Sequence, residues 1–223
     1  MAAFESALVT GGGRRLGLIM ARLLKKKGFD VVIHHRSLSA LELECLRDEG
    51  FHVIGGDLTN EDCVLSLIQK ASDMSKKSLR LLVNNAAIFG QSYTIEDYYT
   101  VNVKSPAQLM KTFYLYCGHG HIINILDGDI FQNQSGLLYY QWSKKSLHDI
   151  SMMLKDQFDP HVRINHIAPS MLLKNSHIID DCSFEKRRLR MAHPPTIDDF
   201  KKAISMLIDT HSMNGQTIVV GHY

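Results

Sequence analysis

Tyr140 and Lys144 are the two side chains whose types and spacing best suit proton transfer in this sequence. They stand four residues apart in a segment with helical periodicity, so both are expected on one face of a helix. A free tyrosine hydroxyl has a pKa of about 10, and an adjacent ammonium group stabilises the phenolate and lowers that pKa. We therefore expect Tyr140 to act as an acid beside Lys144. The alternative is a solvated surface pair, because this spacing also occurs by chance.

A glycine-rich turn precedes these residues near the start of the chain. The segment Thr10–Gly17 lies between a β-branched run and a helical pattern, and that order is typical of a turn that seats a dinucleotide pyrophosphate. Glycines let the backbone approach the phosphates, and free N–H groups at a helix N-terminus bind negative charge. A glycine turn alone is often only a tight turn. The candidate phosphate-binding residues are Gly11, Arg14, Arg15, Leu16 and Gly17.

The end of the second apolar run indicates which dinucleotide binds. NAD enzymes of this architecture usually carry an acidic residue about 20 positions after the turn, whereas this chain has His34-His35-Arg36-Ser37. A guanidinium group can hold a 2′-phosphate with two charge-assisted hydrogen bonds. We therefore expect NADPH, contacted by His35, Arg36 and Ser37. Arg36 as an ordinary surface residue is the alternative.

The residues after the third and fourth apolar runs complete the expected cofactor-binding crevice. Asp57 and Leu58 follow the third run, where the adenine ring should lie, and Asn85 and Ala86 follow the fourth, beside the nicotinamide ribose. Each pair alone is more often a turn. Together they mark the carboxyl ends of strands in one sheet, which is where folds of this class bind ligands.

The pattern of runs predicts the elements that position these residues. Seven strands are expected, at Ser6–Thr10, Asp30–His34, Phe51–Gly55, Arg80–Asn84, His121–Leu126, Val162–Ile167 and Gln216–Val220. Helical patterns at Leu16–Lys27, Leu38–Glu49 and Asn60–Met74 separate the earlier runs. This alternation predicts an α/β fold, with a doubly wound parallel sheet in a single domain over residues 1–223. Residues 174–195 interrupt it, as a functional lid or as an ordered surface connection.

Composition narrows the class of partner. The 25 Lys+Arg and 23 Asp+Glu residues give a net charge of +2, without the basic excess of a dedicated nucleic-acid binder. No apolar run approaches the roughly 20 residues that span a bilayer, and no signal peptide is evident. The four cysteines have no paired spacing and the histidines no ligand spacing, so we expect no disulfide framework and no metal site. A small-molecule partner in the cytoplasm is expected.

The motifs taken in order resemble the short-chain dehydrogenase/reductase family over nearly the whole chain. They are Thr10–Gly17, Asn84–Ala87, Asn102, Asp127, Tyr140–Lys144 and Pro169-Ser170. The resemblance implies a seven-stranded Rossmann-type sheet, hydride transfer from a nicotinamide, catalytic Tyr140 and Lys144, and an Asn102 that holds a proton-relay water. It also implies cofactor contacts at Pro169 and Ser170, and a homotetramer. Without the resemblance, Asn102 is better interpreted as a helix-interior residue bonded to backbone.

Two departures resemble the pteridine reductases and bacterial dihydromonapterin reductases within that family. Arg15 stands where the usual turn has a glycine, and Asp127 stands where the usual catalytic serine precedes Tyr140. A carboxyl group can bond to the ring nitrogens and exocyclic amine of a pterin and help deliver a proton. Phe89 would stack on the flat heterocycle, or else be a core aromatic. Arg15 would then face both the pterin and the phosphates.

Three functions follow from this reasoning. The leading one is NADPH-dependent reduction of a dihydropterin or dihydrofolate, with Asp127, Tyr140, Lys144 and Asn102 as the catalytic residues. The second is reduction of another small carbonyl substrate, with Asp127 only orienting it. The third is an NADPH-binding sensor with little turnover. Ala87, where pteridine reductases tend to carry serine, and the ending Val220-Gly221-His222 are departures that leave the substrate open.

Overall fold

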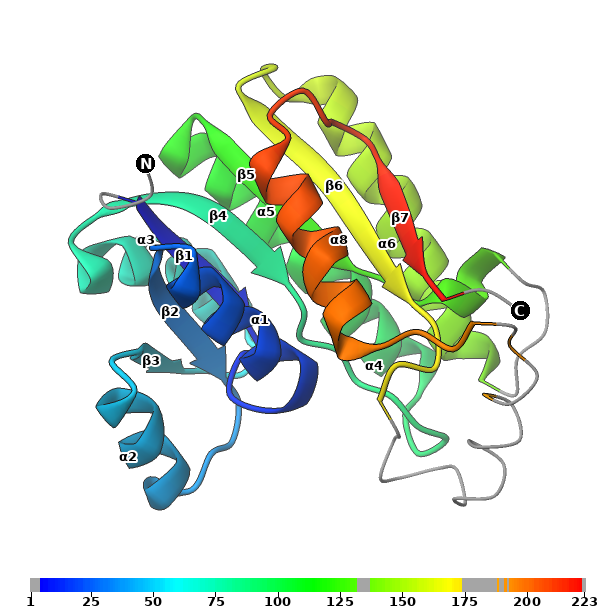
Figure 1. The fold of residues 1–223 in the computed structure, drawn as a ribbon, viewed down its shortest axis with the longest axis horizontal. Helices are drawn as coiled ribbons and strands as arrows, with labels where there is room; N and C mark the ends of the chain where they lie inside the picture. Colours follow the sequence, from blue (N-terminus) through cyan, green and yellow to red (C-terminus); the bar gives the residue numbers. More distant parts are fainter. Residues whose placement is uncertain (1–4, 132–136, 174–187, 189–190, 192, 222–223) are drawn as a thin grey trace.

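A single parallel sheet of seven strands organises the described part of the chain (Figure 1). The computed structural model describes residues 5–131, 137–173, 188, 191 and 193–221. The strand order is β3-β2-β1-β4-β5-β6-β7, and each neighbouring pair is parallel. The strands are β1 (Glu5–Thr10), β2 (Asp30–His35), β3 (His52–Gly55), β4 (Ser78–Asn84), β5 (Gly120–Ile125), β6 (Val162–Pro169) and β7 (Thr217–Val220). The predicted doubly wound α/β fold is confirmed.

Helices cover both faces of the sheet. They are α1 (Arg15–Lys26), α2 (Ala40–Asp48), α3 (Glu61–Ser75), α4 (Ile95–Tyr99), α5 (Ser105–Cys117), α6 (Leu138–Gln157) and α8 (Ile197–Asp209), with a π-helical turn η1 (Thr100–Lys104) and a 3-10 turn η2 (Gly128–Phe131). Figure 1 shows α1 and α8 on the near side of the sheet and α5 and α6 behind it.

Alternation along the strands divides the core between these two helical layers. Ala7 and Val9 of β1 belong to the cluster that includes α1 and α8, and Leu8 belongs to the cluster that includes α3, α5 and α6. Successive side chains of a strand point to opposite faces, so a strand covered on both sides must be apolar at nearly every position. This is why the strands read as continuous apolar runs.

Side-chain caps decide where several helices begin. The sequence predicted a helix from Leu38, but α2 begins at Ala40 because the Ser39 hydroxyl accepts a hydrogen bond from the Glu42 N–H. The Glu42 carboxylate accepts in return from the Ser39 N–H, at 2.8 Å. This capping box satisfies N–H groups that the first helical turn leaves without partners. The two residues before it are left in the connection that follows β2.

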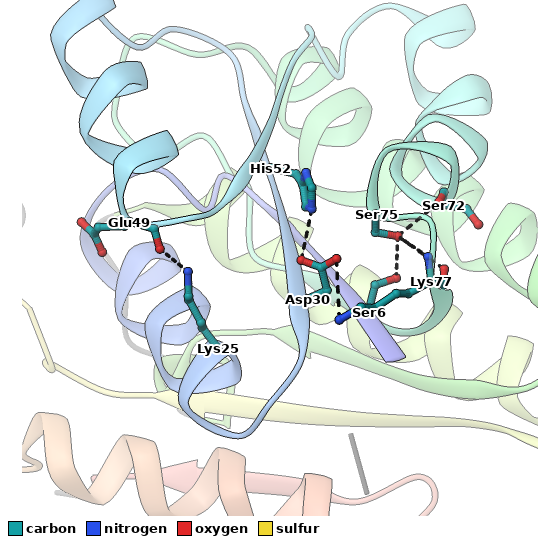
Figure 2. Close-up of polar contacts among 8 residues, drawn as sticks. All are labelled: Ser6, Lys25, Asp30, Glu49, His52, Ser72, Ser75 and Lys77. Carbon is teal, nitrogen blue, oxygen red and sulfur yellow. Dashed lines mark hydrogen bonds and ion pairs between the residues drawn. The ribbon is translucent and has the colours of Figure 1, made fainter. Parts of the chain in front are cut away.

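Polar contacts tie the elements together at the amino end of the sheet (Figure 2). The Asp30 carboxylate, on the first residue of β2, lies 3.1 Å from His52 Nε2 and 4.0 Å from Lys77 Nζ. The Ser75 hydroxyl at the end of α3 donates to the Ser6 hydroxyl of β1 at 3.0 Å. These contacts lie at the amino ends of the strands, whereas the candidate site lies at the carboxyl ends.

The connection between β6 and α8 and the membrane-spanning potential of the helices were both subjects of sequence expectations. Most of the 174–195 segment, considered above as a lid or a surface connection, lies outside the described residues. Arg188, which is described, donates hydrogen bonds to the backbone carbonyls of Met171 and Pro195, each at 2.9 Å. Among the helices that are described, none is both long and apolar enough to cross a membrane.

Candidate active site

A groove of about 450 Å³ runs along the carboxyl ends of β1, β2 and β4. The expected cofactor-binding residues that line it are Gly11, Arg14, Arg15, Leu16, Gly17, His35, Arg36, Ser37, Asp57, Leu58, Asn85 and Ala86. Four other expected cofactor contacts are not among its lining residues: Tyr140, Lys144, and Pro169 with Ser170 at the end of β6. Segments far apart in sequence therefore converge on one surface, as the carboxyl edge of a parallel sheet requires.

Close backbone packing shapes the phosphate end of this groove. Gly11 has a φ of +60°, and a Cβ atom on Gly17 would lie 2.2 Å from the Gly11 carbonyl oxygen. The Asn85 side-chain amide donates to the carbonyls of Thr10 and Gly11, at 2.9 and 3.0 Å. Asn85, which we expected at the cofactor, therefore also holds the turn against the end of β4.

Arg15 occupies a strained position in this turn. Its φ is +51°, in the left-handed region, which costs a non-glycine residue roughly 1–2 kcal/mol. The usual pattern has glycine here, so the backbone keeps the conformation that a glycine would adopt while adding a guanidinium group that lines the groove. Strain of this kind is common at functional sites.

The end of the groove where the sequence predicts a 2′-phosphate differs from the expectation in one respect. Arg14 forms a bidentate ion pair with Glu42, with Nε–Oε1 and Nη2–Oε2 distances of 2.6 and 2.7 Å. An acidic residue therefore lies near this end, although none ends β2. Local sequence could not reveal it, because the capping box of α2 brings Glu42 back toward the turn. Arg36 and Ser37 line the groove from the end of β2.

The residues predicted to transfer protons lie close together where the end of β5 meets α6. The Tyr140 hydroxyl donates a hydrogen bond to Asp127 Oδ2 at 3.0 Å. Lys144 lies one helical turn further along α6, and its Nζ donates to the Ile125 carbonyl at 2.8 Å. The same Nζ is 5.9 Å from the centre of the Tyr140 ring. The structure thus brings together Asp127, Tyr140 and Lys144, which the sequence motifs predicted to act together. We call these three residues the chemical centre.

The protonation states at this centre depart from expectation. Burial, reinforced by the nearby Asp127 carboxyl group, raises the pKa of Tyr140 well above its ordinary value. Burial also raises the pKa of Asp127 and lowers the pKa of Lys144 to about 8. The expected lowering of the Tyr140 pKa by Lys144 is therefore wrong for this arrangement, because the ammonium points to a backbone carbonyl while the carboxyl contacts the phenol. Tyr140 keeps its proton at neutral pH and is available as a donor.

Phe89 connects the groove to the chemical centre. Its ring meets the Tyr140 ring edge to face, with the two centres 4.6 Å apart and the planes at 84°. Phe89 is only half-buried and lines the groove. A flat ring bound at the end of the groove would therefore have an aromatic partner beside the proton donor.

Asn102 lies in the π-helical turn η1 and is buried. Its Oδ1 accepts from the Ile88 N–H at 2.9 Å, and its Nδ2 donates to the Ile88 carbonyl and the Ser143 hydroxyl, at 3.1 and 3.0 Å. These contacts agree with the interpretation of Asn102 as a residue bonded to backbone. The backbone partner, Ile88, lies in the loop after β4 and not in the same helix. Single π-helical turns of this kind often mark functional sites.

Two aromatic residues of the site were missed by sequence reasoning. Tyr93 lines the groove, and the Tyr98 ring centre lies 6.2 Å from that of Tyr140. Both follow the loop after β4, where no motif singles them out. The available signal was the unusual run of aromatic residues between Phe89 and Tyr99.

Comparisons with known proteins show which proteins this chain is similar to. A model of the short chain dehydrogenase family matches residues 5–177. The chain is 26% identical over 212 residues to a dihydromonapterin reductase of Enterobacter sp. (strain 638), covering 90% of this chain and 87% of that protein. The corresponding protein of Escherichia coli (strain SMS-3-5 / SECEC) is 27% identical over the same shares.

Solved structures of other proteins share this fold. The structure of FolM alternative dihydrofolate reductase 1 from Brucella suis in complex with NADP has a TM-score of 0.88 and 27% identity, covering 99% of this chain and 94% of that one. A short chain dehydrogenase from Burkholderia cenocepacia J2315 has a TM-score of 0.86 at 22% identity, which shows the shared fold. The similarity to the Burkholderia structure covers 98% of this chain and 97% of that one.

The packing of the glycine turn predicts the effect of adding one methyl group. Gly17→Ala would overlap the Gly11 carbonyl, so we expect a loss of about 1–3 kcal/mol of stability, typical of overpacking, together with weaker dinucleotide binding. Thermal unfolding and a binding titration measure the two effects. Gly55→Ala is the matched control, because its nearest neighbour would be an ordinary contact at 3.5 Å from His35. Equal behaviour of the two variants would contradict this account of the turn.

Proposed function

Because the chain belongs to the short-chain dehydrogenase family, we propose that it is an NADPH-dependent reductase of a dihydropterin or dihydrofolate-type substrate. The observation that carries the proposal is the part-buried hydrogen bond between the Asp127 carboxyl and the Tyr140 hydroxyl, with Phe89 against the same phenol. Curated relatives named dihydromonapterin reductase, and solved structures named FolM alternative dihydrofolate reductase, support this choice of substrate class.

The groove has the features that an extended dinucleotide needs. Gly11 and Gly17 allow the backbone to approach a pyrophosphate, and Arg36 with Ser37 provides donors for a 2′-phosphate. Two similar structures, FolM alternative dihydrofolate reductase 1 from Brucella suis and from Brucella canis, are complexes with NADP, which supports NADPH as the cofactor. When bound, NADPH supplies the hydride for the reduction. The residues of the chain must then orient the acceptor and deliver a proton.

Reduction of a ring C=N bond requires one hydride at carbon and one proton at the adjacent nitrogen. Tyr140 holds its proton firmly until an acceptor develops negative charge, because its pKa is raised by burial and by Asp127. Asp127 accepts the Tyr140 hydrogen bond through Oδ2, and its Oδ1 accepts from the Asp129 N–H at 2.9 Å. A carboxyl group fixed in this way can face the nitrogens of a pterin while Tyr140 donates the proton.

Lys144 would supply the positive charge of the site. Its Nζ is held by the Ile125 carbonyl next to Asp127, so the ammonium can offset a phenolate formed when Tyr140 gives up its proton. By family resemblance it would also bind the hydroxyls of the nicotinamide ribose. Asn102 would keep the family role of holding a relay water, and Arg15 would face pterin and phosphates.

Assembly and location form a further part of the proposal. We propose that residues 1–223 form one domain that assembles as a cytoplasmic homotetramer. Exposed apolar side chains on α5 and α6 support assembly, among them Leu115, which is 80% exposed, and Met153, which is 64% exposed. Cys45, Cys63 and Cys117, the described cysteines, are free thiols, which is usual in a reducing compartment. Light scattering of the purified protein measures the assembly.

The end of β2 predicts the cofactor preference. We expect NADPH to bind much more tightly than NADH, and Arg36→Asp to shrink or reverse that preference, because a carboxylate there would repel the 2′-phosphate. Fluorescence titration with both cofactors measures the two dissociation constants. Lys70→Asp, a charge reversal at an exposed position of α3 that does not line the groove, is the control. Equal affinities of the unaltered protein for NADPH and NADH would refute the cofactor assignment.

The Asp127 carboxyl predicts the substrate class. Asp127→Ser restores the usual family arrangement, so it should reduce pterin reduction severely while sparing or improving activity on simple carbonyls. The assay follows NADPH oxidation with dihydromonapterin, dihydrobiopterin, dihydrofolate and a panel of carbonyl compounds. Tyr140→Phe is the control, since loss of the proton donor should lower every such activity about 100-fold.

The outcomes of that assay separate the candidate functions. Activity on carbonyls alone would indicate a carbonyl reductase, and binding of NADPH with no turnover would indicate a sensor. Methotrexate should compete with the pterin, because it offers a similar flat heterocycle to Phe89 and Asp127. NADPH-saturated protein that neither binds methotrexate nor reduces any dihydropterin or dihydrofolate would exclude the pteridine assignment.

The buried ammonium of Lys144 predicts a pH dependence of cofactor binding. Its pKa of about 8 means that the charge is present below that pH and is lost as the pH rises through it. NADPH affinity should therefore fall between about pH 7 and 9 in the unaltered protein. Lys144→Met should bind NADPH more weakly and without this pH dependence. If the fall persists in Lys144→Met, another group is responsible for it.

A further inference from the structure

The loop that carries Phe89 is held from both sides by two side chains one helical turn apart. On one side, Asn102 bonds to both backbone groups of Ile88. On the other, the Tyr98 hydroxyl accepts a hydrogen bond from the Gly90 N–H at 2.9 Å and donates one to the Gly90 carbonyl. The residue between the two clamped positions is Phe89.

Tyr98 is almost completely buried. Its side chain is 2% exposed and packs in a small cluster with Ile88 and Val101. Its ring contacts Tyr93 and Tyr140, with centres 5.9 and 6.2 Å away. The hydroxyl is the polar end of an otherwise apolar side chain, and it bonds to the two backbone groups of Gly90.

The conformation of Gly90 explains why this loop needs a clamp. Gly90 is buried and has a φ of +140°, which residues other than glycine rarely adopt. A buried backbone N–H and C=O must find partners, and here both are satisfied by the single hydroxyl of Tyr98. If that hydroxyl is removed, the loop must rearrange or admit water, and the Phe89 ring loses its fixed direction.

We propose that Tyr98 is a positioning residue that sets substrate affinity by holding the Phe89 ring, through Gly90, in the orientation that receives a flat heterocycle. This rests on the proposed function, since it assigns Phe89 to the substrate. Tyr98 should have little effect on proton transfer, because Asp127 and Lys144 are anchored separately at the end of β5. Preorganisation of a binding surface contributes to affinity without adding a contact to the ligand.

Tyr98→Phe tests the proposal, because it removes the hydroxyl and keeps the ring. We expect the KM for the best dihydropterin to rise about tenfold, a loss in the range expected when the two buried hydrogen bonds of this hydroxyl are removed, while kcat changes less than about threefold. The dissociation constant of NADPH should stay within about twofold. Tyr99→Phe, which alters the neighbouring half-exposed tyrosine, is the matched control and should change none of these values.

A double variant shows whether Tyr98 acts through Phe89. Phe89→Ala alone should raise KM, and adding Tyr98→Phe to it should raise KM no further, since the ring to be positioned is already gone. An additive effect, an unchanged KM in Tyr98→Phe, or a loss spread equally over KM, NADPH affinity and thermal stability would overturn the proposal.

Amide hydrogen exchange separates failure of this inference from failure of the proposed function. In Tyr98→Phe the peptides that cover residues 86–93 should exchange faster, while those of β5 and α6 keep their rates. If the unaltered protein reduces no pterin but this local exchange increases, the loop clamp holds and the substrate assignment fails. If exchange of residues 86–93 is unchanged, the clamp itself is refuted.

Discussion

Close backbone contact between the glycine turn after β1 and the end of β4 is the constraint on which the rest of the site depends. A Cβ at Gly11 would lie 3.0 Å from the Ala86 Cα, so the two segments touch without room for a side chain. The Asn85 amide and the Thr10 hydroxyl join them by hydrogen bonds. This contact sets where the groove begins and where the loop with Phe89 leaves the sheet.

The chemical centre illustrates how a buried polar group is made tolerable. Ionisable side chains in an apolar interior are costly unless each has a partner. Tyr140 bonds to Asp127, Asp127 also accepts from a backbone N–H, and Lys144 donates to the Ile125 carbonyl. The partners come from the end of β5 and from α6, which the sheet and the core hold rigidly. Burial then shifts the proton affinities in the directions that favour a protonated tyrosine.

The segment from α4 through η1 acts as a second scaffold beside the sheet. The sheet edge positions the cofactor-binding turns, whereas α4 and η1 supply Tyr98 and Asn102 to the loop after β4. The π-helical turn begins two residues after Tyr98 and contains Asn102, and such a turn adds an extra residue to the helical path. The groove thus draws on two supports, the sheet edge for the glycine turn and α4 with η1 for the loop that carries Phe89.

Local pattern was sufficient to predict the seven parallel strands, the glycine turn and the shared face of Tyr140 and Lys144. These features depend on periodicity and on steric rules that act over a few residues, so they can be read from the chain directly. The family resemblance, confirmed by the match over residues 5–177, added the roles that spacing alone leaves open.

Only the tertiary structure decided the Arg14–Glu42 ion pair, the raised pKa of Tyr140 and the clamp of Tyr98 on Gly90. Each depends on which distant groups meet and on how much water they lose. Proton affinity and hydrogen-bond partnership are properties of a packed environment, and a linear sequence specifies that environment only once the chain has folded.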